Sequence, residues 1–339
     1  MKNIIYLLVL ICLISFLGSC SREHNSTLIV TSWPGTYFDA QKKYYIDPFQ
    51  HDKKISIVTD KTDYGKIRQM VIRKDVTVDL ADVETFFVYQ AGNEGILDEI
   101  DYSKIDTTQI IHQAINKYGV GAVVWSTVIA FNKNMLKNPP NSWADFWDFK
   151  NFPGKRALRD DPISTLEIAL LADGVKPDSL YPLDYKRAFR KLDQIKNKII
   201  WWADGDQPRQ WLNSEEVCMA SAWNGRIYDA IKNGQPLSFI WNQGILDLDW
   251  WVMPKGAKHY NVTTELLKYA SSPEPQALLT NMISYGPTNK LAFSKINSGV
   301  AKWLPSYPEN LKKQLFLNAS WWAKNYESLK EKWDEWKLK

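Results

Sequence analysis

The sequence predicts an α/β fold of two lobes built on mainly parallel sheets. The chain has 339 residues, which is more than one compact core needs. Hydrophobic residues make up 45% of it and charged residues 24%, as in ordinary globular proteins. Short apolar segments alternate with segments of helical spacing, and this βαβαβ order is typical of a parallel sheet covered by helices.

The first twenty residues have the layout of an export signal rather than of a folded element. After a positive start, the apolar run at 4–16 is shorter than the roughly 20 residues that a membrane-spanning helix needs. Residues 17–20 read Leu-Gly-Ser-Cys and resemble a bacterial lipobox, in which cleavage precedes a lipid-carrying cysteine. We expect a signal peptide at 1–19, lipidation of Cys20 and a lipidated tether at 20–26. The alternatives are an uncleaved anchor helix or a plain signal peptide.

The first α/β unit follows from three apolar segments, each succeeded by a segment of helical periodicity. In the second of these helices, Ile67, Met70 and Val71 fall on one face. Gly95 is the expected stop of the third. The predicted strands are 27–31, 55–58 and 78–83; the predicted helices are 37–49, 64–72 and 86–94, with a turn at 33–36.

A second α/β unit begins after residue 118, with a β-branched segment at 120–132. Ser142 is the expected N-cap of a short helix. Further strands are predicted at 154–158, 199–202, 217–222 and 237–240, and helices at 164–172, 185–196, 207–212 and 226–232. Residues 249–253 lead onward to predicted helices at 263–271 and 275–282, and the C-terminal segment is helical and aromatic.

Several kinds of chemistry find no support in the sequence. The four histidines have no metal-ligand spacing to other ligand types, and neither a Gly-x-Ser-x-Gly turn nor a phosphate loop is present. Cys218 has no partner once the signal and Cys20 are set aside, so we expect it in the core without a disulfide. A net charge of +4 gives no reason to expect nucleic acid as a partner. We expect no metal, no cofactor and no catalytic residue.

Acids and tryptophans follow the ends of the predicted strands, where ligands bind in α/β sheets. Aromatic rings and carboxylates together suit a small organic cation, because ring faces attract ammonium groups and carboxylates form charge-assisted hydrogen bonds to them. For each acid the alternative is a solvated turn or a helix cap, as for Asp161 before the helix at 164–172. The candidate ligand-binding residues are Trp33, Tyr37, Glu84, Asp160, Asp161, Trp223, Asp247 and Asp249.

Asp249 is the expected main anchor among them. Asp247 and Asp249 alternate with Leu246, Leu248 and Trp250, so both should point to one face of a strand. Two uncompensated carboxylates in a partly buried cleft are costly, and a bound ammonium group would relieve that cost.

Several segments together resemble a known family. The chain resembles the spermidine/putrescine-type periplasmic binding proteins of ABC importers, over about 28–289. Position by position, the family's first-strand tryptophan falls on Trp33, its acidic pair near Asp160 and Asp161, its Trp-Asn-Gly turn on Trp223 and its hinge-strand aspartate on Asp249. The segments that carry the resemblance are the Trp33 turn, SWADFW at 142–147, FPGKR at 152–156, WNGR at 223–226 and DWWVMPKGA at 249–257.

The resemblance implies a two-lobed, type II-like periplasmic binding protein fold whose crossing hinge strands join the lobes around a ligand. It implies lobe one at 27–128 plus about 250–300, lobe two at 129–249, and C-terminal helices at 301–339 that pack on the lobes. It also implies a monomeric, extracytoplasmic protein that is no enzyme. The lipobox adds the expectation of a lipid anchor on a bacterial membrane. Such a protein delivers a putrescine- or spermidine-like cation to an ABC transporter permease.

Two departures from the family pattern leave the ligand open. Residues 84–87 read Glu-Thr-Phe-Phe where many polyamine binders have Ser-Thr-Tyr-Tyr, and Asp247 stands in place of a hinge-strand tryptophan. The first alternative ligand is therefore a zwitterionic amino acid such as γ-aminobutyrate, or an opine. Arg209 or Arg226 would then pair with its carboxylate, although Arg209 more readily fits a helix surface.

A carbohydrate-active enzyme is the second alternative. The pair Asp160 and Asp161, or the pair Asp247 and Asp249, would then imitate the two carboxylates of a glycosidase.

Overall fold

The computed structural model describes residues 27–339. The expected signal peptide at 1–19, the lipidation of Cys20 and the tether at 20–26 lie outside the described residues. Among the residues that are described, no helix is both long enough and apolar enough to cross a membrane.

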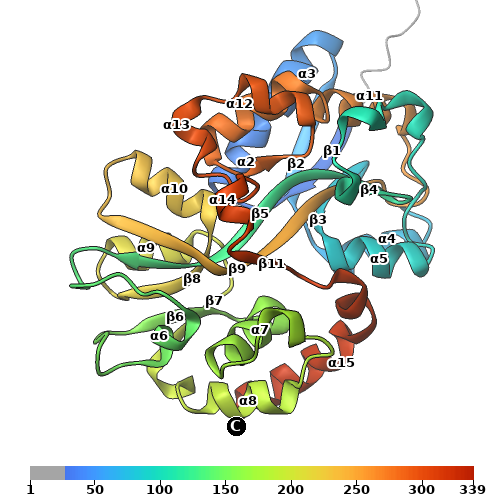
Figure 1. Ribbon diagram of the computed structural model, residues 1–339. Helices are drawn as coiled ribbons and strands as arrows, with labels where there is room; N and C mark the ends of the chain where they lie inside the picture. The colour runs from blue at the N-terminus through green and yellow to red at the C-terminus, as the bar shows by residue number, and fades with distance from the viewer. Residues whose placement is uncertain (1–26) are drawn as a thin grey trace, which may run out of the picture.

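Two long strands join the two lobes seen in Figure 1. β5 (Gly119–Asn132) and β9 (Leu237–Val252) pair antiparallel and pass from one lobe into the other. The main path through the sheet is β2 (Ser56–Lys61), β1 (Thr27–Ser32), β3 (Leu80–Glu84), β9, β5, β8 (Met219–Trp223), β6 (Arg156–Arg159) and β7 (Ile199–Trp202). Along this path the strands run parallel within each lobe and antiparallel where they meet a crossing strand. The late strand β11 (Gln314–Phe316) runs parallel to β9. We call the half with β1–β3 lobe one and the half with β6–β8 lobe two. The expected α/β fold with crossing hinge strands is confirmed.

Lobe one combines an early and a late part of the chain. Leu28 and Val30 of its central strand are fully buried, as a strand covered by helices requires. Asp63 caps one helix by accepting a hydrogen bond from the Lys66 backbone N–H (2.9 Å). The early elements are β1 (Thr27–Ser32), α2 (Thr36–Gln41), a π-helical turn (Lys42–Ile46), α3 (Asp47–Lys53), β2 (Ser56–Lys61), α4 (Tyr64–Ile72), β3 (Leu80–Glu84), α5 (Thr85–Asn93) and β4 (Ile115–Asn116). The late elements are α11 (Tyr260–Ala270), α12 (Pro273–Ile283) and β10 (Gly286–Pro287).

Lobe two comes from the middle of the chain. Ser142 stands at the N-cap of its first helix, as expected. Its elements are α6 (Trp143–Trp147), β6 (Arg156–Arg159), α7 (Pro162–Ala172), α8 (Tyr185–Asp193), β7 (Ile199–Trp202), α9 (Gln207–Asn213), β8 (Met219–Trp223) and α10 (Asn224–Lys232).

The strand predicted at 237–240 is too short, because β9 continues as one strand to Val252. Residues 241–244 read Trp-Asn-Gln-Gly and look like a turn, but they form an irregularity within the strand, where the pairing register with β5 shifts. Gln243 has a φ of +60° there, and its side-chain Oε1 accepts a hydrogen bond from the Trp143 backbone N–H (3.0 Å). This contact with lobe two holds the irregular segment in place.

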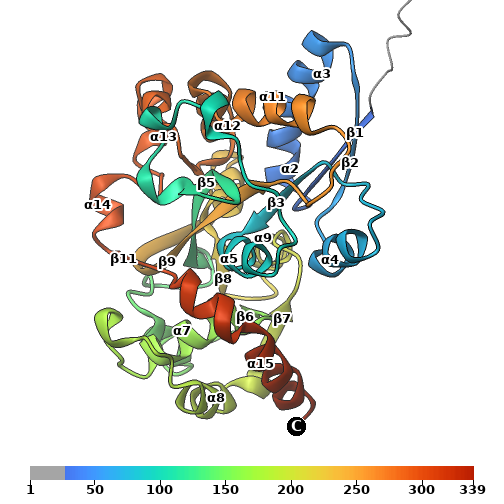
Figure 2. The same cartoon turned by 90° about the vertical axis from the view of Figure 1, so that its right-hand side faces the viewer.

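The C-terminal segment contains α13 (Ser298–Ala301), α14 (Pro308–Leu311), β11 (Gln314–Phe316) and α15 (Ala319–Leu338). Figure 2 shows α15 running from the side of α5 down along α7 and α8. Its Tyr326 ring lies 4.4 Å from the Phe86 ring of α5, measured between centroids. On the lobe-two side, Trp322 Nε1 donates to Glu167 of α7 (2.6 Å). One helix therefore packs against both lobes.

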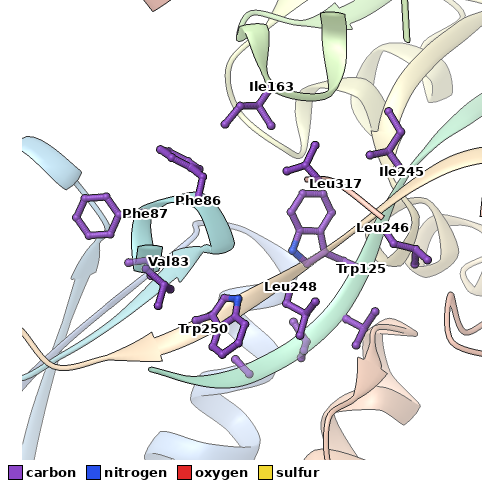
Figure 3. Packing of buried hydrophobic residues seen from close by; sticks show 14 of the residues in the cluster. Val83, Phe86, Phe87, Trp125, Ile163, Ile245, Leu246, Leu248, Trp250 and Leu317 are labelled. Atoms are coloured by element: carbon purple, nitrogen blue, oxygen red, sulfur yellow. The ribbon is translucent and has the colours of Figure 1, made fainter. Parts of the chain in front are cut away.

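Apolar side chains fill the junction where the lobes meet. Figure 3 shows residues of β3, α5, β5 and β9 gathered there, among them Val83, Phe86, Trp125, Leu248 and Trp250. Each of these side chains is nearly or fully buried. The crossing strands therefore rest on a packed core, and the residues at the ends of β1, β3 and β8 are left to form the space between the lobes.

Candidate ligand-binding site

A largely enclosed cavity lies between the lobes. Its free volume is only about 10 Å³, and both lobes and both crossing strands contribute to its wall. A larger hollow of about 590 Å³ beside Phe49 and Tyr269 is open and is bordered by exposed charged residues, so it lacks a protected interior. The wall of the enclosed cavity consists of Trp33, Tyr37, Glu84, Trp125, Trp223, Arg226, Asp249 and Tyr285.

One buried carboxyl group orients the two lobe-one rings of the wall. Trp33 Nε1 donates to Asp82 Oδ1 (3.1 Å), and the Tyr37 hydroxyl donates to Asp82 Oδ2 (2.8 Å). Gln41 Nε2 also donates to Asp82 Oδ2 (2.5 Å). Burial raises the pKa of Asp82 to about 7, against the opposing effect of these hydrogen bonds. Asp82 on β3 therefore fixes the orientation of two rings without lining the cavity itself.

Asp249 is the acid of the wall that has no cationic partner. It lies on β9 opposite Glu84 of β3, and its Oδ1 accepts a hydrogen bond from Trp125 Nε1 (3.0 Å). Burial raises the pKa of Asp249 well above its ordinary value, and the charges of Asp82, Glu84 and Asp247 raise it further. No ion pair to Asp249 is formed within residues 27–339. An ammonium group placed here would favour its ionised form.

Glu84 is paired inside the protein. Arg159 Nη2 lies 2.9 Å from Glu84 Oε1, which joins β6 of lobe two to β3 of lobe one. Burial raises the pKa of Glu84, and the Arg159 guanidinium opposes that rise. The charge of Glu84 is thus largely balanced by Arg159, which leaves Asp249 as the acid available to a ligand.

Arg226 brings a second guanidinium to the cavity wall. It lies in the first turn of α10, directly after β8, and its side chain is 1% exposed. Its Nη1 donates to the Pro34 backbone carbonyl of lobe one (2.7 Å) and to Asp206 Oδ1 of lobe two (3.1 Å). The guanidinium carbon lies 5.4 Å from the centroid of the Trp223 ring, within range of a cation–π contact.

Three buried N–H groups around Trp223 have no hydrogen-bond partner among the described residues. They are Arg226 Nε, Trp223 Nε1 and Arg159 Nη1. The Trp223 ring lies close to both guanidinium groups, 5.5 Å from that of Arg159. Buried donors without partners are unfavourable and uncommon in folded proteins. Of the three, Trp223 and Arg226 line the cavity, so their side of it is suited to an anionic group, while the Asp249 side is suited to a cationic one.

The cavity wall contains five of the eight predicted ligand-binding residues: Trp33, Tyr37, Glu84, Trp223 and Asp249. Each of them lies at or shortly after a strand end, or on a crossing strand.

Asp160 and Asp161, two of the predicted residues, lie outside the wall of this cavity. Asp160 accepts a hydrogen bond from Trp333 Nε1 of α15 (2.9 Å). Asp161 caps α7 by accepting from the Ile163 backbone N–H (2.9 Å), the alternative raised for it from the sequence. Its Oδ2 also accepts from the Tyr326 hydroxyl (3.1 Å). Both acids point to α15 because that helix covers the end of β6, which could not be seen from the pattern of β6 itself.

Asp247 is also placed differently from the expectation. It lines a separate hollow beside Thr85 and Tyr181 rather than the cavity of Asp249. The Thr85 hydroxyl donates to its Oδ1, because β3 ends opposite Asp249 and α5 begins at Thr85. Burial raises the pKa of Asp247 to about 7. It acts on the cavity through its charge, which contributes to the raised pKa of Asp249.

Three wall residues were absent from the predicted set. Trp125 lies inside β5, and no turn signal marked it. Tyr285 follows α12, far along the chain from the other wall residues. The sequence predicts Arg226 only as a partner for the carboxylate of the alternative ligand. Its position three residues after Trp223, a predicted wall residue, is the sequence feature that indicates its place in the wall. Arg209 does not line the cavity.

Metal ligands and reactive thiols do not add to this site. Within residues 27–339, no group of three or more histidine, cysteine, aspartate or glutamate side chains could hold a metal ion. Cys218 is fully buried and free.

Comparison with known proteins gives relatives over nearly the whole chain. The chain is 34% identical over 327 residues to a γ-aminobutyric acid-binding protein of Pseudomonas aeruginosa, covering 94% of this chain and 93% of that one. A solved γ-aminobutyrate receptor has a TM-score of 0.86 and 37% identity, over 92% of this chain and 98% of that chain. The periplasmic binding protein AgtB of A. tumefaciens R10, in complex with agropinic acid, has a TM-score of 0.87 and 36% identity, over 93% and 99%.

The expected kinship with polyamine-binding proteins is confirmed at greater distance. A spermidine/putrescine-binding periplasmic protein of Haemophilus influenzae is 26% identical over 287 residues, which cover 80% of this chain and 77% of that protein. Residues 44–309 match the family described as bacterial extracellular solute-binding protein. This match and the relatives covering nearly its whole length show that the chain belongs to the bacterial extracellular solute-binding protein family.

Proposed function

We propose that this protein binds a small zwitterionic amino acid of the γ-aminobutyrate type between its lobes and delivers it to an ABC transporter permease. The observation that carries the proposal is that one acid without a cationic partner, Asp249, and one guanidinium group, Arg226, line the same enclosed cavity. The ammonium group of the ligand would lie near Asp249. Its carboxylate would accept hydrogen bonds from the donors around Trp223 and Arg226.

Arg226 favours a zwitterion over a diamine. Putrescine carries a cation at each end, so one of its ammonium groups would have to approach the guanidinium side of the cavity. There the free groups are N–H donors, which an ammonium group cannot use because it is itself only a donor. A carboxylate accepts from them and gains charge-assisted hydrogen bonds.

The size of the cavity favours a short ligand. The free volume is about 10 Å³, room for about one water molecule, so the walls must separate for any ligand to enter. A short ligand such as that of the γ-aminobutyrate-binding relatives requires the smaller separation. An opine such as the agropinic acid bound by AgtB is bulkier and would require the walls to move further apart.

The acids of the wall are less suited to glycoside hydrolysis. Of the two carboxylate pairs considered from the sequence, Asp160 and Asp161 face α15, and Asp247 lies outside the cavity of Asp249. Glu84 remains beside Asp249, but it is engaged by Arg159. These placements support a binding function. Export, lipidation at Cys20 and a periplasmic location on a bacterial membrane remain part of the proposal.

Calorimetry with a panel of ligands tests the function. We expect γ-aminobutyrate to bind more tightly than putrescine, spermidine or maltose. Arg226→Gln should abolish the preference for γ-aminobutyrate over putrescine, because it removes the charge that the carboxylate requires. Arg187→Gln, which alters a surface ion pair with Asp173, is the control and should change neither affinity. Tighter binding of putrescine by the wild-type protein would refute the proposal.

A further inference from the structure

Lobe one touches Arg226 through backbone atoms, and the contact depends on Gly35. Gly35 precedes α2 and has a φ of +92°. A Cβ atom built on it would overlap Asp206 Oδ2 and Arg226 Nη1. Next to it, the Pro34 carbonyl accepts the hydrogen bond from Arg226 Nη1 (2.7 Å). The turn of lobe one and two side chains of lobe two thus meet with no room for a methyl group.

Asp206, which like Arg226 belongs to lobe two, accepts a hydrogen bond from the same guanidinium nitrogen. It lies just before α9, is 15% exposed, and its Oδ1 is 3.1 Å from Arg226 Nη1. Pro34, Gly35 and Asp206 are not part of the cavity wall. They can therefore influence a ligand only through Arg226 and through the fit of the two lobes.

We infer that Asp206 and the Pro34–Gly35 turn form a clasp that positions Arg226 for the carboxylate of the ligand, complete only when the lobes are closed. The inference rests on the proposed function, in which Arg226 binds that carboxylate. When the lobes separate, the Pro34 carbonyl leaves with lobe one, and Arg226 retains Asp206 alone. Closure and carboxylate recognition then stabilise each other, because each is more favourable when the other has occurred. Ligands without a carboxylate gain less from closure.

Two variants test the clasp without touching the cavity wall. Asp206→Asn keeps the shape and removes the charge. Gly35→Ala places a methyl group where the closed lobes leave no space. We expect both to speed dissociation of γ-aminobutyrate by about tenfold or more, with a much smaller change in association, since encounter precedes closure. Stopped-flow tryptophan fluorescence measures both rates.

The controls separate the clasp from general damage. Gly174→Ala shares a positive φ (+83°) and has no atom within 4 Å of the added methyl group, and Asp178→Asn removes an exposed charge. Both should keep wild-type rates. Butylamine, which lacks a carboxylate, should bind Asp206→Asn and wild-type protein alike.

The possible failures are distinguishable. If the wild type binds γ-aminobutyrate and both variants release it at the wild-type rate, the clasp is refuted and the proposed function stands. If Asp206→Asn weakens butylamine and γ-aminobutyrate equally, Asp206 has only a structural role and the clasp is again refuted. If the wild type prefers putrescine, the proposed function itself fails.

Discussion

At the scale of single residues, Asp249 places an acid on one side of the cavity and Arg226 places a guanidinium group on the other. Asp249 is buried, lies near three other carboxyl groups and accepts one hydrogen bond from Trp125. Arg226 is buried as well, but Asp206 and the Pro34 carbonyl compensate its charge. Asp249 is therefore the unbalanced acid of the wall, and a ligand's ammonium group would balance it.

Asp249→Asn should weaken binding of the cognate ligand by about 2–5 kcal/mol, the usual cost of breaking a buried, hydrogen-bonded charge pair. Without ligand, the variant should be as stable as the wild type or more stable, because the repulsion from Asp82, Glu84 and Asp247 is removed. Calorimetry and thermal unfolding measure the two effects. Asp178→Asn, at an exposed position, should change neither the affinity nor the thermal stability. Unchanged affinity would exclude Asp249 as the anchor.

The wall residues that could be predicted share one property. Each lies on or after a strand whose end is marked in the sequence by a change from apolar to polar or turn-forming residues. Trp33, Glu84 and Trp223 each stand at such an end. Trp125 could not be found in this way, because it is one apolar residue within a fully buried strand of fourteen. Asp160 and Asp161 follow a strand end but lie outside the wall, because a helix from elsewhere in the chain, α15, covers that end.

At the scale of elements, α15 acts as a brace between the lobes. Tyr326 packs on Phe86 of lobe one, while Trp333 Nε1 donates to Asp160 at the end of β6. Trp333 is fully buried and its ring lies 5.4 Å from that of Trp201 on β7. Trp333 therefore joins the hydrogen bond from Trp322 to Glu167 in holding α15 on lobe two.

Trp333→Ala should lower the free energy of unfolding by about 3–5 kcal/mol, because it leaves a cavity and removes the partner of Asp160. Chemical denaturation monitored by circular dichroism measures it. Leu338→Ala in the same helix is a matched control, since Leu338 is 90% exposed and its truncation should have little effect. Equal stability of the two variants would show that α15 contributes little to the fold.

The order of helices and strands along the chain was predictable. Features that depend on contacts between distant parts of the chain were harder to predict. The alternation of apolar and amphipathic segments predicted the strands and helices of both lobes, because each has its own periodicity. The continuity of β9 was missed, because contacts with the distant residues Trp143 and Lys313 keep Gln243 within the strand. Such contacts leave no periodic trace in the local sequence.

At the scale of the whole molecule, several buried carboxyl groups have pKa values above the ordinary value of aspartate. Burial raises the pKa of Asp82 and of Asp247 to about 7, and that of Asp249 is raised well above its ordinary value. In the unfolded chain, aspartate titrates near pH 4. Between about pH 4 and 7 the folded protein binds more protons at these groups than the unfolded chain does. Its stability therefore falls as the pH rises through this range.

A ligand with an ammonium group should reverse part of this trend, because it favours the ionised carboxylates near Asp249. We expect the rise in melting temperature caused by saturating γ-aminobutyrate to be larger at pH 8 than at pH 5, with protons released on binding. Thermal unfolding at the two pH values, and calorimetry in buffers of different ionisation enthalpy, measure these effects. In Asp249→Asn the pH dependence should be smaller. A larger rise at pH 5 would contradict the electrostatic account.

The long strand β9 has a consequence for how the chain acquires its fold. β9 lies between β3 and β5 in the sheet, yet both of those partners precede it by a long stretch of chain. A nascent chain that ends before Leu237 lacks the late part of lobe one and exposes the edges of β3 and β5, which invite aggregation. Pairings of such high contact order form slowly. Because β9 also carries Asp249, the anchor for the ligand arrives in the same step that joins the two lobes.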